Sequence, residues 1–318
     1  MPPAPDPGAA YRLLAANIQR VIQGKPEVVR LAVVALFAEG HLLVEDVPGL
    51  GKTSLARSLA RSIGGKWSRI QFTPDLLPGD ITGVTVYHQG EGSFAFHPGG
   101  IFANVVLADE INRGTPKTQS ALLEVMAERQ VTVDAVRHPV PRPFLVVATQ
   151  NPIELDGTYR LPEAQLDRFL MRVRVGYPDH DAEVRILIDD AVGVNPDRLQ
   201  PVLDLAALEQ IIATVQKLHV HPEIASYAVR VAAATRVHPA IRYGASPRGS
   251  VALIRAARAA AAIDGRSYVT PDDVKAVAPA VLEHRLILTP EAELNRQSTA
   301  AVLTEVLDAT SVPTAAGR

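Results

Sequence analysis

Apolar residues recur along the chain with two different periods, and the change of period divides the chain into two parts. Near the start, Leu14, Ile18 and Ile22 lie at helical spacing, and a second apolar-faced helix is predicted over residues 27–39. Short runs rich in Val, Leu, Ile and Phe follow, separated by helical segments or long loops. They occupy residues 41–46, 69–72, 104–109, 143–150 and 169–175. This alternation indicates an α/β fold with a parallel five-stranded sheet covered by helices on both faces.

The second part of the chain, from about Tyr177 onward, shows no strand pattern and a strong helical period. Its predicted helices cover residues 182–191, 205–217, 224–236, 248–263, 272–284 and 291–308. Two of the helix starts are well marked, because Ser246 and Thr270 each supply a capping hydroxyl directly before a Pro.

These patterns predict two domains with a boundary near Pro178. Residues 1–178 form the α/β core, and residues 179–318 form an all-α lid domain. Residues 1–10 are rich in Pro and Ala, without a basic start or an apolar centre, and we expect them to be a disordered tail rather than a signal peptide.

Two segments of the core are predicted to be inserted hairpins. Residues 72–102 combine Pro and Gly with alternating apolar residues such as Val84 and Phe94, which indicates a small hairpin within a helical region. Residues 130–142 are predicted to form a second hairpin before the fourth strand. Both segments are candidates for contact with a partner, and ordinary surface loops are the alternative.

Residues 44–53, Val-Glu-Asp-Val-Pro-Gly-Leu-Gly-Lys-Thr, form a phosphate-binding loop between a predicted strand and a predicted helix. Glycine lets the backbone approach phosphate oxygens, so that N–H groups and the positive end of the helix point at the anion. Lys52 adds a charge for the β- and γ-phosphates, and Thr53 offers a hydroxyl suited to Mg²⁺. The strict pattern G-x-x-x-x-G-K-S/T would place Gly where this chain has Asp46. The predicted nucleotide-binding residues of the loop are Pro48, Gly49, Leu50, Gly51, Lys52, Thr53 and Ser54.

Polar residues end two of the predicted strands. Asp109 and Glu110 follow an apolar run, where Asp109 can hold the water shell of Mg²⁺ and Glu110 can deprotonate the attacking water. Asn151 follows the next strand, and since parallel strands end at one edge of a sheet, it is expected beside Asp109 and can position that water. Taken alone, Asp-Glu is also a helix-start signal, and Asn before Pro is a common turn.

Two arginines are candidates for stabilising charge on a transferring phosphoryl group. Arg168 lies in Leu166-Asp167-Arg168-Phe169, and Arg248 lies in the first turn of a predicted helix, from which its side chain can reach toward the core. An arginine delivered to the γ-phosphate is worth about 10³ to 10⁵ in kcat in comparable enzymes. Without the surrounding motifs both would be read as surface residues.

Composition narrows the classes of protein. Lys and Arg number 32 against 34 Asp and Glu, so no overall positive field favours nucleic acid. The absence of Cys excludes disulfides and thiolate metal sites. The apolar run over 31–38 is too short to span a membrane. His219 and His221 have no adjacent carboxylate pair to complete a metal site. We therefore expect a soluble, cytoplasmic protein.

The motifs together resemble the MoxR family of AAA+ ATPases. The segments that carry the resemblance are residues 45–53, 107–113, 116–133, 148–154 and 161–178. The most specific are Asp-Glu-Ile-Asn-Arg at 109–113, the run over 117–124 and Leu-Pro-Glu-Ala-Gln-Leu-Asp-Arg-Phe at 161–169. The similarity extends over about residues 12–308, and members of the family often carry a residue other than Gly at the place of Asp46.

The resemblance implies roles for the candidate residues. Asp109 and Glu110 would be the Walker B pair, Asn151 the sensor-1 residue, Arg168 the arginine finger and Arg248 the sensor-2 arginine. AAA+ proteins hydrolyse ATP between subunits of a ring, here expected to be a homohexamer, so Arg168 would act on the nucleotide of a neighbour. Whether Arg248 acts in its own subunit or across the interface stays open.

The resemblance also implies contacts and partners. Ile22 and Gly24 occupy the place where related ATPases contact the adenine. The two hairpins would be the helix-2 and pre-sensor-1 insertions of this branch. ATP and Mg²⁺ are the expected cofactors, and the expected partner is a client or adaptor protein with a von Willebrand factor A domain, which ATP hydrolysis would remodel or mature.

Three other functions remain as alternatives. A metal-insertion motor similar to the small subunit of magnesium chelatase shares the architecture and differs by its partner. A nucleic-acid motor is disfavoured by the balanced charge and by the lack of a DNA-binding module. A nucleotide-gated scaffold is disfavoured because Glu110, Asn151 and Arg168 are not needed for binding alone.

Overall fold

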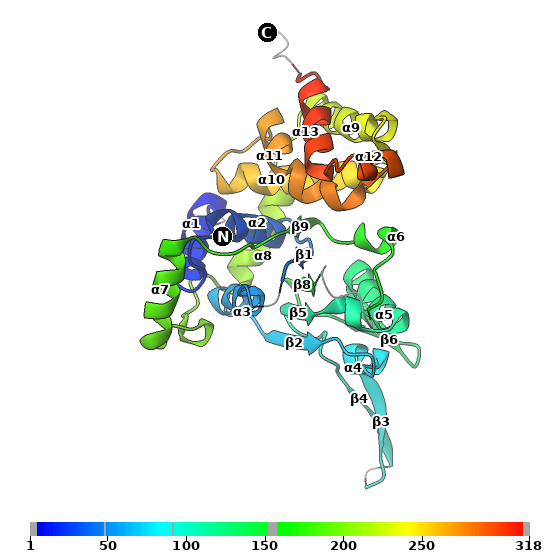
Figure 1. Cartoon of the computed structure of the whole chain (residues 1–318). Helices are drawn as coiled ribbons and strands as arrows, with labels where there is room; N and C mark the ends of the chain where they lie inside the picture. The colour runs from blue at the N-terminus through cyan, green and yellow to red at the C-terminus, as the bar shows by residue number, and fades with distance from the viewer. Residues whose placement is uncertain (1–4, 48, 91, 152–157, 314–318) are drawn as a thin grey trace.

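The computed structural model describes residues 5–47, 49–90, 92–151 and 158–313. The sheet lies in the lower half of the molecule, and a group of helices from the C-terminal part lies above it (Figure 1). Pro48 and the first four residues of the predicted tail lie outside the described residues.

The central sheet has the predicted five parallel strands. In spatial order they are β2 (Trp67–Gln71), β5 (Val105–Asp109), β8 (Leu145–Gln150), β1 (Leu42–Glu45) and β9 (Met171–Val173). Every neighbouring pair is parallel. The three strands that lead to the phosphate loop, to Asp109 and to Asn151 are therefore neighbours and end at the same edge of the sheet.

Helices cover both faces because alternate residues of the strands point to opposite sides. Val105 and Leu107 of β5 belong to the same apolar cluster as the helices on one face: α1 (Pro7–Gln19), α2 (Pro26–Phe37) and α3 (Lys52–Ser62). Val106 and Ala108 belong to a second cluster, with α5 (Pro116–Glu128) on the other face.

The disordered tail predicted over residues 1–10 is too long. Helix α1 begins at Pro7, and the Asp6 carboxylate accepts hydrogen bonds from the N–H groups of Gly8 and Ala9 at 3.3 and 2.9 Å. Ala10 is buried against the core. Asp followed by Pro is a strong helix start, which the composition of the tail masked.

Both predicted hairpins are present. The first consists of β3 (Val84–His88) and β4 (Ser93–His97) after the short α4 (Pro78–Thr82), and it extends away from the core (Figure 1). The second consists of β6 (Gln130–Val133) and β7 (Val136–Pro139). The hairpins touch where the ring of Phe96 stacks on His138, with centroids 3.8 Å apart.

The C-terminal part is mainly helical, as predicted. Its elements are α7 (His180–Ala191), η2 (Pro196–Arg198), α8 (Leu205–Gln216), α9 (Pro222–Val237), α10 (Pro247–Ile263), α11 (Pro271–Leu282), η3 (Glu283–Arg285), α12 (Pro290–Leu294) and α13 (Thr299–Ala309). Two short helices, η1 (Ile111–Arg113) and α6 (Glu163–Leu166), lie in the core. Ser246 and Thr270 cap α10 and α11 as predicted.

Two expectations for this part were wrong. A two-stranded antiparallel ribbon joins β10 (Ile241–Tyr243) to β11 (Ile287–Leu288), and strands this short leave no alternation to detect. The single helix predicted over residues 291–308 is broken into α12 and α13. Arg296 has a positive φ of 56°, and Ser298 caps the second helix.

Helix α7 lies beside α1 and α3, apart from α9–α13, whereas α8 packs against both α2 and α10 (Figure 1). Gln23 Nε2 donates to Asp189 of α7 at 3.0 Å, and Asn17 Nδ2 donates to the Gln200 carbonyl at 3.0 Å. The domain boundary near Pro178 stays a prediction.

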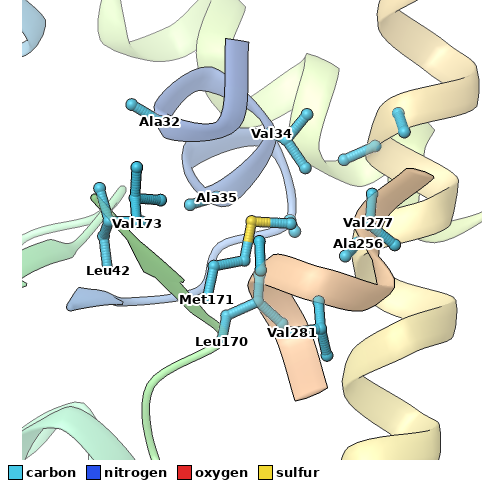
Figure 2. Packing of buried hydrophobic residues seen from close by; sticks show 14 of the residues in the cluster. Ala32, Val34, Ala35, Leu42, Leu170, Met171, Val173, Ala256, Val277 and Val281 are labelled. Carbon is cyan, nitrogen blue, oxygen red and sulfur yellow. The ribbon is translucent and has the colours of Figure 1, made fainter. Parts of the chain in front are cut away.

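One apolar cluster joins the two parts of the chain (Figure 2). Val34 and Ala35 of α2 and Met171 of β9 pack with Ala256 of α10 and Val277 of α11. The lid helices are therefore anchored on the strand next to β1, which leads to the phosphate loop. No helix in the described residues is long and apolar enough to cross a membrane.

Candidate nucleotide-binding and catalytic site

The phosphate loop connects β1 to α3. Backbone N–H groups lie along the loop and at the start of the helix. Gly49 and Gly51 have positive φ angles of 85° and 79°, a backbone region that favours glycine. Gly51 is the N-cap residue of α3, and no side chain caps this helix end. The N–H groups of the first turn and the positive helix end are therefore available to an anion.

Asp46 does not need the backbone freedom of the Gly that the strict motif places there, because its φ angle is not positive. Its Oδ2 accepts from the Gly176 N–H at 2.6 Å, and its Oδ1 accepts from the Val47 N–H at 2.9 Å. Its carbonyl accepts from Lys52 Nζ at 2.7 Å. Asp46 thus ties the base of the loop to the segment after β9, and the departure from the strict motif has a structural role.

A pocket of about 400 Å³ collects most of the predicted site residues. It is lined by Gly49, Gly51, Lys52, Thr53, Ser54, Arg69, Asp109, Glu110 and Asn151. Leu50 does not line it and instead packs, partly buried, against the apolar core. Three strand ends therefore bring the phosphate loop, the two carboxylates and the amide to one place.

Asp109 is held from two sides. The Thr149 hydroxyl donates to Asp109 Oδ1 at 2.6 Å and accepts from the Glu110 N–H at 2.8 Å. Arg69 donates to Asp109 Oδ2 through Nε at 3.1 Å and Nη2 at 2.6 Å. The carboxylate is therefore fixed at the end of β5 and faces the pocket.

Glu110 leaves the strand direction directly after Asp109. Its φ of 55° is in the left-handed region, so the backbone turns out of the strand at this residue. Its Oε2 accepts from Gln71 Nε2 at 2.9 Å and from Arg113 Nη1 at 3.0 Å. These contacts hold the Glu110 carboxylate at the rim of the pocket.

Asn151 follows β8 and is buried beside the carboxylates, where the prediction placed it. Its carbonyl accepts from Asn112 Nδ2 at 3.3 Å. Its role as the residue that positions water stays a prediction.

Arg168 and Arg248 do not line this pocket. Both line a second pocket of about 530 Å³, together with Asp167, Arg255 and Arg285 among others. Both arginine side chains are exposed, and an Nη1 donor of Arg168 contacts the Leu123 carbonyl of α5. The two predicted arginines are thus close to each other and apart from the phosphate loop of the same chain.

Ile22 and Gly24, the predicted adenine contacts, lie between α1 and α2. Ile22 is buried, and its Cδ1 atom lies 4.0 Å from the position that a Cβ of Gly51 would take. Gly24 has a φ of 67° and lies against Ala182 of α7. Ile22 therefore reaches the phosphate loop, while an adenine contact by either residue stays a prediction.

The site contains residues that the sequence patterns did not single out: Gln71, Arg69, Arg113 and Thr149. Gln71 and Arg69 come from β2, whose register sets Gln71 opposite Asp109. Only the order of the strands in space shows that β2 borders β5. Thr149 precedes Gln150 and Asn151 in the sequence, and its position at the end of a strand was the available signal.

The donor set suits a hard divalent cation. The Thr53 hydroxyl and the Asp109 carboxylate offer oxygen ligands in the same pocket as Lys52. Mg²⁺ prefers oxygen ligands and keeps several waters, so two protein groups and phosphate oxygens are enough. In the part of the chain that the structure describes, including this pocket, no group of three or more His, Asp or Glu could hold a metal.

Comparison with known proteins agrees with this arrangement. Residues 41–171 match the model of the ATPase family associated with various cellular activities (AAA), and residues 233–306 match the AAA lid domain. A crystal structure of a candidate ATPase from Cytophaga hutchinsonii superposes with a TM-score of 0.90. It is 36% identical, and the match covers 97% of this chain and 96% of that one.

Two relatives extend the similarity over nearly the whole chain. The protein YeaC of Bacillus subtilis is 48% identical over 297 residues, which cover 93% of both proteins. The protein named Chaperone MoxR1 of Mycobacterium tuberculosis is 46% identical over 309 residues, covering 93% of this chain and 81% of the relative. With an AAA core, an AAA lid and a nucleotide pocket built on a phosphate loop, the chain belongs to the MoxR family of AAA+ ATPases.

Proposed function

We propose that the chain hydrolyses ATP in a ring of its own copies, expected to be a hexamer, with each active site built from two neighbouring chains. One observation carries the proposal: Lys52, Asp109 and Glu110 line one pocket, whereas Arg168 and Arg248 line another. A γ-phosphate in the first pocket does not meet these two arginines of its own chain. A neighbouring chain can supply both, so Arg248 would act across the interface together with Arg168.

Binding of ATP would rest on the phosphate loop. The N–H groups after Gly49 and at the start of α3 donate to phosphate oxygens, and Lys52 adds a point charge. Ile22 and Gly24 would contact the adenine. Thr53 and Asp109 would hold Mg²⁺, the latter through water. The ion would supply positive charge against the β- and γ-phosphate oxygens.

Hydrolysis needs a base and an oriented water. The Glu110 carboxylate takes a proton from the water, whose oxygen attacks the γ-phosphorus as the bond to the ADP oxygen breaks. The Asn151 amide at the neighbouring strand end orients this water. Thr149 fixes the angle between the two carboxylates, since its hydroxyl contacts both Asp109 and the backbone of Glu110.

We also propose that turnover drives chaperone-like remodelling or maturation of a client complex in the cytoplasm. The β3–β4 hairpin extends from the core (Figure 1) and exposes Val84, Tyr87 and Phe94, which suits contact with another protein. The name of the mycobacterial relative, Chaperone MoxR1, supports this role. The proposed client carries a von Willebrand factor A domain. A metal-insertion motor is the alternative, and the identity of the protein captured by a Glu110→Gln variant in ATP would separate the two.

The test of the shared site mixes two inactive variants. Glu110→Gln keeps a functional Arg168, and Arg168→Ala keeps a functional phosphate pocket, so each is expected to be inactive alone. In an equimolar mixture, random assembly pairs an intact pocket with an intact arginine at about one quarter of the interfaces. We therefore expect ATP hydrolysis to return to about one quarter of the wild-type rate in the mixture.

Protein concentration gives an independent check. Wild-type activity per chain should rise steeply with concentration as rings assemble. Activity that is constant per chain, with no recovery in the mixture, would mean that every chain is a complete catalyst, and the shared site would be wrong. Lys52→Ala serves as the control, since it should bind no nucleotide and show no activity alone.

A further inference from the structure

We propose that Asp167 and Arg285 are positioning residues for ATP hydrolysis. Their ion pair fixes the turn that carries Arg168 to the helical lid that carries Arg248, so that both arginines reach a neighbouring nucleotide together. This inference rests on the shared site proposed above. Neither residue lies in the phosphate pocket, and neither was singled out by the sequence patterns.

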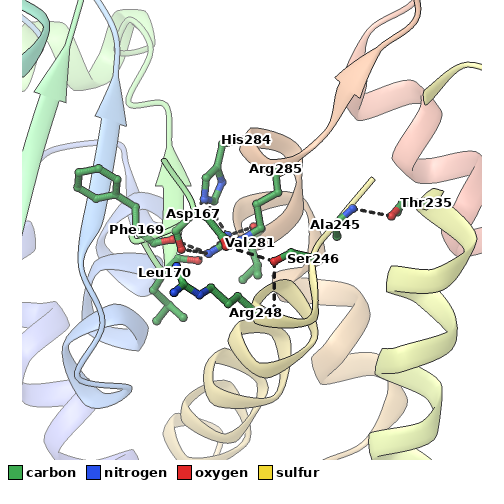
Figure 3. A network of polar contacts seen from close by, with 10 residues as sticks. All are labelled: Asp167, Phe169, Leu170, Thr235, Ala245, Ser246, Arg248, Val281, His284 and Arg285. Carbon is green, nitrogen blue, oxygen red and sulfur yellow. Dashed lines mark hydrogen bonds and ion pairs between the residues drawn. The ribbon is translucent and has the colours of Figure 1, made fainter. Parts of the chain in front are cut away.

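Arg285, at the end of η3, donates hydrogen bonds to the residues on both sides of Arg168 (Figure 3). Its Nε donates to Asp167 Oδ1 at 2.7 Å, and its Nη2 donates to the carbonyls of Asp167 at 3.2 Å and Phe169 at 2.7 Å. The residues before and after Arg168 are therefore bonded to one guanidinium. Because that group has a fixed planar geometry, the backbone at Arg168 cannot shift without breaking these bonds.

Asp167 also contacts the start of the helix that carries Arg248. The Ser246 hydroxyl donates to Asp167 Oδ2 at 3.2 Å and accepts from the Arg248 N–H at 3.2 Å as the cap of α10 (Figure 3). One carboxylate thus bonds Arg285 through one oxygen and the α10 cap through the other. The turn with Arg168 and the helix with Arg248 are held through a single side chain.

The energetics of the pair argue for a geometric role. The Arg285 side chain is only 4% exposed, and burial lowers the pKa of its guanidinium, against the opposing effect of Asp167. In the described residues, Asp167 is the only carboxylate within ion-pair distance of Arg285. A buried ion pair contributes little to stability on balance, because both charges must lose their water. Because burial of this ion pair gives little net stability, and because the pair lies beside Arg168 and Arg248, we attribute to it the role of positioning these two arginines.

The aliphatic part of the Arg285 side chain also packs against α10, the helix that carries Arg248. A Cβ added to Gly249, the residue after Arg248, would lie 3.5 Å from Arg285 Cδ. The first turn of α10 therefore packs directly on the side chain that holds the Arg168 turn. Arg285 therefore contacts both the turn that carries Arg168 and the helix that carries Arg248.

The test uses two conservative variants and a matched control. Asp167→Asn keeps the shape of the side chain, and Arg285→Lys keeps its charge but loses the planar fork. The control, Arg266→Lys, weakens a similar pair in the lid, where Arg266 donates to Asp273 at 2.5 and 2.6 Å away from both pockets. We expect kcat to fall about tenfold or more in Asp167→Asn and Arg285→Lys, while their KM for ATP stays within about twofold of wild type. Both kcat and KM of the control variant should stay within about twofold of wild type.

Mixing separates positioning from general damage. A chain with Asp167→Asn or Arg285→Lys keeps its own phosphate pocket, so Glu110→Gln should restore its activity to the level of the Glu110→Gln and Arg168→Ala mixture. Mixing with Arg168→Ala should restore nothing, because neither partner supplies a placed arginine. If Glu110→Gln rescues Arg168→Ala but not these variants, Asp167 and Arg285 act elsewhere and the inference is wrong. If Glu110→Gln restores the activity of none of these variants, including Arg168→Ala, the proposal of a shared site is wrong, and so is this inference.

If circular dichroism shows that Asp167→Asn and Arg285→Lys do not fold, Ser246→Ala provides a third test. It removes one bond to Asp167 and leaves the Arg285 pair intact. Ser298→Ala is its control, because Ser298 caps α13 in the same way, away from both pockets. We expect Ser246→Ala to lower kcat several-fold, and mixing with Glu110→Gln should restore its ATPase activity. The kcat of Ser298→Ala should equal that of the wild type. Equal activities of the two variants would contradict the proposal.

Discussion

Thr149 donates its hydroxyl hydrogen to Oδ1 of Asp109 at 2.6 Å, and this bond couples two neighbouring strands of the sheet at the nucleotide pocket. The hydroxyl oxygen of Thr149 also accepts from the Glu110 N–H at 2.8 Å. Thr149 is almost completely buried, so no solvent replaces these bonds when the hydroxyl is removed. The relative position of the two carboxylates therefore depends on one hydroxyl from β8.

Thr149→Val should reduce hydrolysis without changing the shape of the core. The variant leaves the Glu110 N–H without its partner and removes the hydrogen bond to Asp109 Oδ1, so that among the described residues only Arg69 still holds this carboxylate, at a cost of about 1–3 kcal/mol in stability. We expect kcat to fall about tenfold and the half-saturating Mg²⁺ concentration to rise. Steady-state ATPase assays over a Mg²⁺ series measure both.

A matched control is Thr118→Val, whose buried hydroxyl donates to the Leu76 carbonyl at 2.8 Å outside the nucleotide pocket. Its activity should stay close to wild type. Equal kinetic losses in the two variants would show that loss of a buried hydroxyl, and not the position of Asp109, causes the effect.

Arg69 should compete with a bound cation for Asp109, since its two donors contact Oδ2. The Arg69 side chain is half exposed, so the pair is worth at most about 1 kcal/mol. Arg69→Ala should therefore lower the half-saturating Mg²⁺ concentration by up to about fivefold, as measured by Mg²⁺ titration of the ATPase rate.

Arg61→Ala provides the comparison for this variant, because Arg61 forms an exposed ion pair with Asp197 outside the pocket. It should leave the Mg²⁺ dependence unchanged. If Arg69→Ala instead raised KM for ATP at saturating Mg²⁺, Arg69 would contact the nucleotide rather than compete with the metal.

The sheet and the phosphate loop were predictable from the sequence because their signals are local. The β5 strand, Val-Val-Leu-Ala-Asp, is apolar up to its last residue, as expected for a strand buried on both faces. The glycines and Lys52 lie within a few residues of one another. Asp109 and Glu110 were predicted from the apolar run before them, and the rule that parallel strands end at the same edge placed Asn151 beside Asp109.

The features that escaped prediction depend on spatial order or on weak local signals. The contact of Arg69 with Asp109 follows from the pairing of β2 with β5, which no local pattern specifies. The break between α12 and α13 falls in the polar segment over residues 295–298, a local signal that the single helix predicted over 291–308 did not take into account. The proximity of Arg248 to Arg168 depends on how the lid packs on β9, a relation between residues distant in the sequence.

Asp46→Gly would restore the strict phosphate-loop motif, yet it should weaken this protein. The change removes the acceptors of the Gly176 and Val47 N–H groups, 2.6 and 2.9 Å away, and adds backbone freedom to the unfolded chain. We expect a loss of about 1–2 kcal/mol in unfolding free energy and weaker nucleotide binding.

Urea unfolding and titration with a fluorescent ATP analogue measure these two effects. Asp46→Asn, which keeps an acceptor oxygen, should recover part of the stability. Tighter nucleotide binding by Asp46→Gly would mean that Asp46 does not organise the loop.

His41 should make the protein sensitive to acid between about pH 6.5 and pH 4. Its ring is buried: Nδ1 accepts from the Val146 N–H at 3.0 Å, and Nε2 therefore donates to the Met126 carbonyl at 3.1 Å. Burial lowers the pKa of His41 from 6.5 to about 4, with Arg129 and Arg255 acting in the same direction. The unfolded chain thus binds a proton that the folded chain does not, so the stability from the neutral ring is complete above pH 6.5 and is lost as the pH falls toward 4.

His41→Gln removes this titration. Between pH 7.5 and pH 5, the wild type should lose about 2 kcal/mol of unfolding free energy more than the variant. Urea unfolding at fixed protein concentration measures this, because carboxylates and the buried His284 titrate in both proteins and cancel in the difference. Parallel pH profiles for the two proteins would mean that the folded state accepts a proton at His41. In that case the bond from Val146 would not fix its neutral form.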